Sequence, residues 1–185
     1  HPTPLGHQVA SGFLSFAEQH DDAIAEAERA IALNANNPAG YFAMAKALTY
    51  AGQPGKAAEL IGKAMRLNPH YPPDYLFHLG MSRFGMERFD EAAKSLEEAR
   101  KRVPTHRGTL TFLVAAYGFL ERPARARSAL DELKQLAINA LVDFRLSTTV
   151  LDANKWPFKD PADLERLREG LRKGGMPEFK DEWGL

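Results

Sequence analysis

The sequence predicts an all-α protein built as a solenoid of stacked helix–turn–helix repeats. The first observation is a spacing: Ala23, Ala57, Ala92 and Ala126 recur at intervals of 34, 35 and 34 residues. The second is that apolar residues around each alanine follow the three-to-four residue spacing of amphipathic helices. A period near 34 residues is typical of helical hairpins that bury their apolar faces against neighbouring hairpins.

The second repeat, residues 38–72, shows the pattern most fully. An apolar stripe over residues 41–48 predicts its first helix, and the Gly-Gln-Pro-Gly sequence at 52–55 ends that helix. Another stripe over residues 57–64 predicts the second helix, which the Asn-Pro pair at 68–69 ends. Each repeat is therefore expected to be a pair of short helices joined by a tight turn.

The other repeats keep the same scheme with some departures. The third covers about residues 73–106 and the fourth about residues 107–140, where Pro123 suits the start of the second helix. The first, about residues 4–37, is the weakest match because Ala35 replaces a closing proline. Terminal repeats are often atypical, since one side has no neighbouring repeat.

The period stops after the fourth repeat. Apolar spacing in residues 141–153 predicts a capping helix over the last repeat, and residues 154–185 are predicted to be a linker, a short helix and a tail. Asp160 and Pro161 suit the N-cap and first position of that short helix. Gly174-Gly175 is predicted to end it.

Residues 4–140 carry Gly80, Ala92, Ala99 and Pro104, with similar residues in the neighbouring periods. This pattern resembles the tetratricopeptide repeat (TPR) family. The resemblance implies a right-handed superhelix in which the first helix of each repeat lines a concave groove. The small residues let the paired helices approach closely, where larger side chains would overpack the contact. Repeat proteins of this kind mostly bind other proteins.

A second resemblance concerns the segment from Phe158 to Glu178 and the sequence at 68–73. Both are similar to the repeat region of certain bacterial signalling proteins with a class III adenylate or guanylate cyclase domain. The chain holds no such domain, so the resemblance implies no nucleotide chemistry. It implies a regulatory or oligomerising segment of a larger signalling protein.

Composition excludes several classes of partner. Lys and Arg total 24, as do Asp and Glu, so the formal net charge is zero and gives no global attraction to nucleic acid or anionic membranes. We interpret the basic residues at 100–102 and 122–127 as solvated helix faces. No apolar run is long enough to span a membrane. We therefore expect neither nucleic acid binding nor membrane insertion.

The cellular compartment stays open at this stage. The absence of cysteine fits both a reducing cytoplasm and a periplasm, with the cytoplasm slightly favoured. The chain begins with His1, which is consistent with a processed protein or a fragment of a longer one.

No constellation of residues predicts catalysis. None of the six histidines forms a pair at zinc-ligand spacing on one helix, and no nucleophile elbow, phosphate loop or dinucleotide fingerprint is present. Gly174-Gly175 fits a helix stop better than a phosphate cradle. We therefore expect a protein that is not an enzyme, with no catalytic residue, cofactor or metal.

The predicted functional site is the groove. In the resembled fold, residues one helical step from the core stripe face the concave surface. That lining is rich in aromatic residues and methionine, which are favoured anchors at interfaces. The predicted partner-binding residues are Phe16, Phe42, Lys46, Tyr50, Phe77, Met81, Phe84 and Phe119.

The favoured function is a non-catalytic scaffold or adaptor module that binds a protein or peptide in this groove. Three alternatives stay open: the rings pack between repeats as core, a second copy fills the groove in a homo-oligomer, or the tail folds back into it. The tail residues considered are Met176, Phe179, Trp183 and Leu185. Recognition of a terminal carboxylate is disfavoured, because Lys46 is the only cation in the groove.

Overall fold

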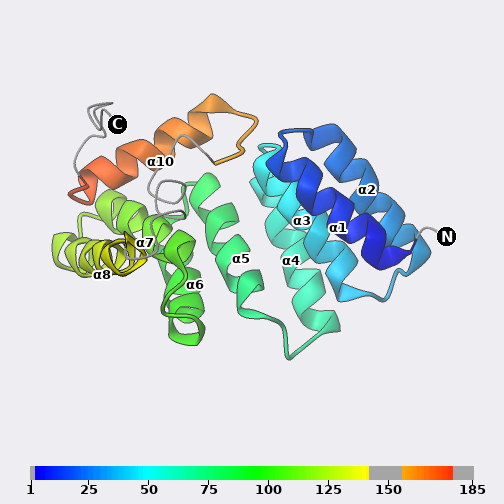
Figure 1. The fold of residues 1–185 in the computed structure, drawn as a ribbon, viewed down its shortest axis with the longest axis horizontal. Helices are drawn as coiled ribbons and strands as arrows, with labels where there is room; N and C mark the ends of the chain where they lie inside the picture. The colour runs from blue at the N-terminus through cyan, green and yellow to red at the C-terminus, as the bar shows by residue number, and fades with distance from the viewer. Residues whose placement is uncertain (1–2, 142–155, 177–185) are drawn as a thin grey trace.

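The computed structural model describes residues 3–141 and 156–176, with side-chain positions in the first range up to residue 136. Within these ranges all regular structure is α-helical (Figure 1). The helices are α1 (Pro4–Phe16), α2 (His20–Leu33), α3 (Pro38–Tyr50), α4 (Pro54–Leu67), α5 (Pro73–Gly85), α6 (Phe89–Arg102), α7 (Arg107–Phe119), α8 (Pro123–Leu141) and α10 (Pro161–Lys173).

The helices form four antiparallel hairpins stacked in one row. The first helices, α1, α3, α5 and α7, contact one another in sequence and form one layer. Each later first helix also packs against the second helix of the preceding hairpin, as α3 does against α2. The predicted all-α helical-repeat solenoid is therefore confirmed.

The recurring alanines lie where the two helices of each hairpin meet. Ala23, Ala57, Ala92 and Ala126 are all fully buried. Gly80 shows how little space the contact leaves, because a Cβ atom there would lie 2.6 Å from the Leu96 side chain. Since interiors are packed close to crystal density, larger residues at these positions would force the helices apart.

Each hairpin turn has the same geometry. Glu18, Gly52, Glu87 and Glu121 all have a left-handed backbone, with φ between 53° and 76°. In the first turn, the N–H of Glu18 donates to Ser15 and that of Gln19 to Leu14, which is a Schellman motif; the other three turns repeat these bonds. The turn satisfies backbone groups at the helix end and fixes how the hairpin closes.

The connections account for the irregular period. Every turn inside a hairpin has three residues, as in 17–19 and 51–53. Between hairpins, the connections at 34–37 and 103–106 have four residues, whereas that at 68–72 has five. The 35-residue interval thus arises from one extra residue between two hairpins.

The predicted short helix is confirmed as α10. The Asp160 side chain accepts a hydrogen bond from the Ala162 N–H at 2.8 Å, and Pro161 is the first helical residue. α10 ends in another Schellman motif, in which Gly175 has φ 90° and Met176 donates to Leu171. The predicted capping helix at 141–153 lies almost entirely outside the described residues.

α10 packs against α7 at the end of the row (Figure 1). The two backbones touch, because a Cβ at Gly118 would collide with the Gly170 carbonyl oxygen. Likewise, a Cβ at Gly174 would lie 2.6 Å from Val114. Leu167 and Leu171 join the core of the last two hairpins, so α10 is part of the folded domain.

Candidate partner-binding face

The first helices carry the residues predicted to bind a partner. We call the surface of α1, α3, α5 and α7 that bears them the inner face. Phe16 is 64% exposed, whereas Phe42, Lys46 and Phe119 are half-buried. The remaining four are at most 5% exposed: Tyr50, Phe77, Met81 and Phe84.

An extended segment of the same chain contacts two of those four residues, Tyr50 and Phe77. The Trp156 ring lies 5.1 Å from Phe112 and 6.3 Å from Phe77, measured between ring centroids. The Phe158 ring lies 5.8 Å from Tyr50. The backbone N–H of Lys159 donates a hydrogen bond to the Tyr50 carbonyl oxygen at 2.8 Å. Residues 156–159 therefore cross the inner face from α7 to α3. We call them the covering segment.

The expectation of accessible side chains is thus wrong for Tyr50, Phe77, Met81 and Phe84, which are at most 5% exposed. Their burial has two causes. Neighbouring first helices pack closely enough for ring-to-ring contact, as between Phe84 and Phe112 at 5.3 Å, and residues 156–158 cover what is left. Whether these side chains ever contact a partner stays a prediction.

Some residues that shape this face were not predicted from the sequence. The sequence places Trp156 in a linker, and the alternative in which the tail fills the groove concerned Met176 and three residues beyond it. Met176 is indeed buried against the core, whereas Phe179, Trp183 and Leu185 lie outside the described residues. Phe112 was missed as well. A signal existed, because residues 108–119 contain no charged side chain, which is typical of a helix covered on all sides.

Phe119 lies at a different place from the other predicted residues. Its ring stacks on Phe89 of α6 with centroids 4.2 Å apart, and the Lys173 ammonium lies 4.6 Å from its centroid. It therefore fills the junction of α6, α7 and α10. This position favours a structural role for Phe119.

The half of the inner face near α3 is more open. Phe42 stacks on Tyr75 with centroids 4.2 Å apart, and Tyr75 stacks on Tyr71 at 6.1 Å. We call these three rings the ring ladder. Lys46 lies 5.8 Å from the Phe42 centroid at one end, and Arg102 lies 4.9 Å from that of Tyr71 at the other. Phe42 and Tyr71 are half-buried, so both present ring surface to solvent.

The layer beneath the ladder is uncharged near neutral pH. His78 is buried and makes edge contacts with Phe42, Tyr50 and Phe77 at 5.0–6.2 Å. Burial, with smaller effects from Lys46 and His106, holds the pKa of His78 well below its ordinary value. Burial likewise raises the pKa of the Tyr50 hydroxyl. The inner face thus rests on neutral aromatic groups.

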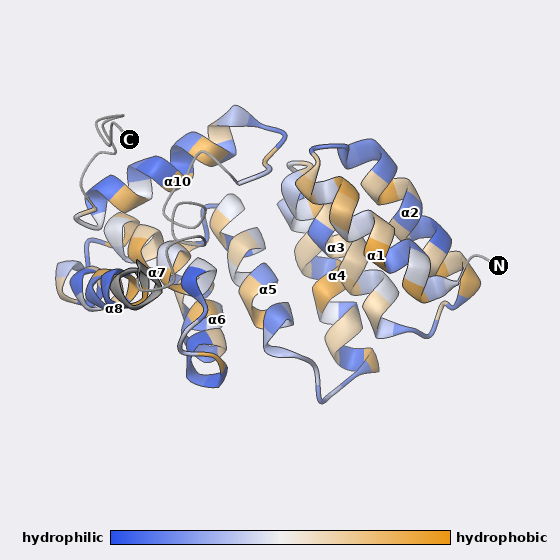
Figure 2. Ribbon diagram, viewed as in Figure 1, coloured by the Kyte–Doolittle hydropathy of each residue, from blue (hydrophilic) through white to orange (hydrophobic). Residues whose placement is uncertain are grey.

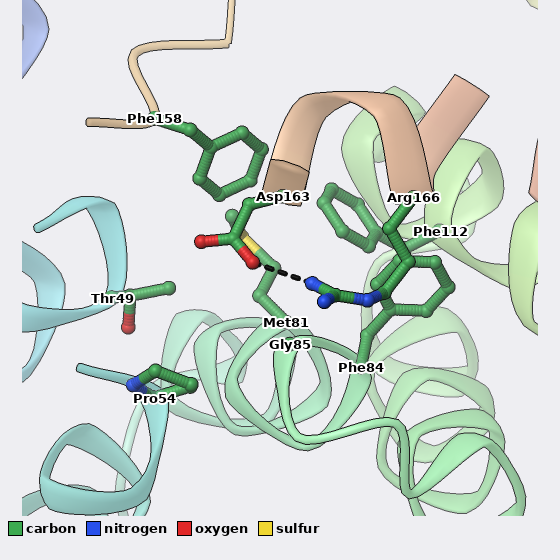
Figure 3. Close-up of a pocket in the computed structure, with 9 residues that line it drawn as sticks. All are labelled: Thr49, Pro54, Met81, Phe84, Gly85, Phe112, Phe158, Asp163 and Arg166. Carbon is green, nitrogen blue, oxygen red and sulfur yellow. Dashed lines mark hydrogen bonds and ion pairs between the residues drawn. The ribbon is translucent and has the colours of Figure 1, made fainter. Parts of the chain in front are cut away.

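A small cavity lies where the covering segment meets α10 (Figure 3). Its free space of about 10 Å³ is roughly enough for one water molecule. Asp163 and Arg166 pair at 2.5 Å across it, and Arg166 also lies 3.3 Å from Glu87 in the α5–α6 turn. Burial raises the pKa of Asp163, and the Arg166 charge opposes that shift. The cavity is too small to hold a substrate.

The described part of the chain has neither a metal-binding cluster nor a membrane-spanning helix. Among the described residues, no three His, Asp or Glu side chains come together in a way that could hold a metal ion. None of the described helices has the length and apolar character needed to cross a membrane.

The comparisons with known proteins agree with this geometry. Residues 17–99 match the family described as anaphase-promoting complex, cyclosome, subunit 3. No curated protein matches the chain. Neither this family nor the similar structures described below are cyclase proteins, so the cyclase resemblance of the tail finds no support.

Three solved structures share the architecture. TTC0263, a thermophilic TPR protein of Thermus thermophilus, is 18% identical and matches 95% of this chain and 100% of its own, with a TM-score of 0.64. PilF of Pseudomonas aeruginosa is 16% identical over 95% of this chain and 78% of its own, with a TM-score of 0.65. YrrB, a TPR protein with an unusual peptide-binding site, is 15% identical over 91% of this chain and 83% of its own, with a TM-score of 0.59. The chain thus has the fold of TPR proteins.

Proposed function

We propose that this chain is a non-catalytic protein–protein interaction module that binds a peptide or an extended partner segment on its inner face. One observation carries the proposal: the face already holds an extended segment of the chain itself, residues 156–159. That segment uses two rings and one backbone hydrogen bond to Tyr50. A partner segment with similar side chains could make the same contacts. YrrB, whose fold is similar, has a peptide-binding site.

The predicted residues divide into two groups. Phe16, Phe42 and Lys46 are at least partly exposed and would contact a partner first. A partner that displaces residues 156–158 would then reach Tyr50 and Phe77. The other three predicted residues, Met81, Phe84 and Phe119, would support the face from beneath or beside it.

The chemistry of the face indicates the kind of partner. The ring ladder favours aromatic and long aliphatic side chains, because stacked rings gain about 0.5–1.5 kcal/mol beyond their buried area. Lys46 and the exposed Asp74 have opposite charges, so the face has little preference for net charge. We expect an apolar or aromatic segment of about neutral charge.

The first test removes the two rings of the covering segment. The double variant Trp156→Ala/Phe158→Ala should expose the half of the inner face that these rings cover, while leaving α10 packed on α7. A synthetic peptide of residues 154–160 should bind this variant at least tenfold more tightly than the unmodified chain, as measured by calorimetry. The matched control is the same peptide with alanine in place of both rings. Far-UV circular dichroism checks that the variant stays folded.

A second experiment examines the open half of the inner face, near α3. Adding Phe42→Ala and Lys46→Ala to the double variant should weaken binding of partner peptides selected from a displayed library. These two side chains are only half-buried, so the fold should survive the change. If the peptide fails to bind the opened variant and selection yields no binder sensitive to these substitutions, the proposal is wrong.

Self-occupation is the second candidate function, and the contacts of residues 156–159 favour it. In that case the chain regulates itself, and the covering segment competes with any partner. The two experiments together separate the candidates. A selected partner peptide that binds the opened variant and depends on Phe42 and Lys46 favours the interaction module, whereas binding of the chain's own 154–160 peptide alone favours self-occupation.

A further inference from the structure

The outward side of α1 carries an exposed apolar stripe. Leu5, Val9, Phe13 and Phe16 are spaced by four, four and three residues, so they lie on one side of the helix. Each is between 49% and 74% exposed. Figure 2 shows that α1 is largely apolar along its length, whereas α10 is mostly hydrophilic. We call these four residues the α1 stripe.

Two of the four stripe positions, those of Val9 and Phe13, are buried in every later hairpin. The four first helices each have 13 residues, so their positions correspond one to one. The counterparts of Val9 and Phe13 are at most 8% exposed. They are Ala43, His78 and Phe112 for Val9, and Ala47, Ser82 and Ala116 for Phe13.

Contacts with the preceding hairpin bury those counterparts. Ser82 of α5 lies 3.1 Å from Thr49 of α3, measured between their hydroxyl oxygens. His78 of α5 contacts Phe42 of α3, and Phe112 of α7 contacts Phe84 of α5. The middle of the α1 stripe, Val9 and Phe13, thus occupies the positions with which one hairpin packs on another, and the described residues leave about half or more of each stripe residue exposed.

The stripe is suited to contact with a copy of itself. α1 contains no Asp, Glu, Lys or Arg, so two α1 helices can meet without repulsion between like charges. Its His7 is already paired with Glu26 at 2.5 Å. Two-fold symmetric contacts require a surface that complements itself, and an uncharged apolar stripe meets that requirement.

The opposite end of the row does not match the stripe. α10 covers α7 there, and α8 presents Arg125, Arg127, Asp131 and Lys134 to solvent. Docking the stripe on that end would bury charges without partners, which costs more than the apolar contact returns. Head-to-tail stacking of copies is therefore disfavoured.

We propose that the α1 stripe is the interface of a two-fold symmetric homodimer, in which α1 of one copy packs against α1 of the second. The phenyl groups of Phe13 and Phe16 alone expose about 250 Å². Stable interfaces bury about 800 Å² on each partner. The dimer is therefore expected to dissociate on dilution. The two proposals share Phe16, but Leu5, Val9 and Phe13 are not among the predicted partner-binding residues, so the dimer does not depend on the proposed peptide-binding function.

Sedimentation equilibrium over a concentration series provides the first test. The unmodified chain should shift from monomer to dimer, and Phe13→Lys should weaken the dimer at least tenfold, because it sets two like charges against each other. The matched control is Leu33→Lys, which changes an exposed leucine in the last turn of α2 and should leave the dimer intact. A monomer at all concentrations, or a dimer unaffected by Phe13→Lys, would overturn the proposal.

A cross-linking experiment tests the symmetry. The chain has no cysteine, so a single-cysteine variant carries one thiol. Gly12 lies beside the middle of the stripe with open space around it, so Gly12→Cys should form a disulfide-linked dimer under mild oxidation. Leu33→Cys should not. A dimer that Phe13→Lys disrupts but Gly12→Cys fails to cross-link would overturn the two-fold arrangement.

Discussion

At the scale of single residues, the buried histidine beneath the inner face sets how the fold responds to acid. His78 is 4% exposed, and its Nδ1 atom has no hydrogen-bond partner among the described residues. Its neighbours are the rings of Phe42, Tyr50 and Phe77. A charged imidazole there would lose its hydration without gaining a counter-charge, so the folded chain keeps His78 neutral.

We therefore expect stability to fall on acidification. The pKa of His78 is well below 6.5 in the folded state and near 6.5 in the unfolded state. Between those values the unfolded chain binds more protons, so the free energy of unfolding falls as the pH drops below about 6.5. The slope is at most about 1.4 kcal/mol per pH unit for this group. Urea unfolding at pH 7.5 and 5.5 measures it.

The control for this expectation is His78→Met, which keeps a similar volume and favourable contacts with the rings. This variant should lose much of the pH dependence. A residual slope is expected, because burial also lowers the pKa values of His20 and His106. An unchanged slope would show that His78 is not responsible.

The exposure of single rings could not be predicted from the sequence. Phe77 and Phe42 both lie on first helices and both fit the apolar pattern. They differ because His106, Phe112 and Trp156, all far from Phe77 in the sequence, contact its ring and not that of Phe42. Replacing Phe77 by alanine would open a cavity at a cost of about 3–5 kcal/mol, so such a variant reports on stability more than on binding.

At the scale of helices, the contact between α7 and α10 depends on glycine. Gly118→Ala should push α10 off α7, because the added methyl meets backbone atoms of residues 170 and 174, which cannot move aside as a side chain can. We expect lower thermal stability and faster hydrogen exchange in α10. Gly12→Ala is the matched control: it also lies in a first helix but has open space around it, and should stabilise by about 0.5–1 kcal/mol.

Comparing the two variants shows whether the packing of α10 on α7 requires glycine at position 118. If Gly118→Ala behaves like Gly12→Ala, α10 does not depend on this close approach. Protection of the α10 amides is the sharper measurement, since it separates detachment of one helix from general loss of stability.

The sequence predicted the helices better than it predicted their contacts. Prolines at helix starts, the alanine spacing and the Asp160-Pro161 pair are local signals, and the structure confirms the helices that they mark. The contact of α10 with α7 depends on Gly118 and Gly170, which are 52 positions apart. A glycine within a helix does not by itself indicate which distant helix it contacts, so this pairing has no local signal in the sequence.

At the scale of the whole molecule, clusters of buried apolar residues link the second, third and fourth hairpins to the C-terminal segment, and Ile24 and Ile31 of the first hairpin pack against them. One cluster of buried residues extends from Tyr50 through α5, α6, α7 and α8 to Leu171. A second joins α3, α4 and Tyr75. Because α3 and α5 belong to both, the described core should unfold as one cooperative unit.

We expect two probes to give the same denaturation midpoint. Trp183→Phe leaves Trp156 as the single tryptophan, and its fluorescence reports the segment on the inner face. Far-UV circular dichroism reports the helices. Coincident transitions in urea would support one unit, whereas an earlier fluorescence change would mean that the segment leaves the inner face before the hairpins unfold.

The five-residue connection at 68–72 shows where this chain tolerates a change in length. An extra residue inside a three-residue turn would disrupt the Schellman hydrogen bonds that fix how the hairpin closes. Between hairpins, the same insertion already occurs and the packing on either side is kept. A reporter loop or affinity tag therefore has a natural point of entry between residues 69 and 70, on exposed backbone away from the α1 stripe and from the residues that the covering segment contacts.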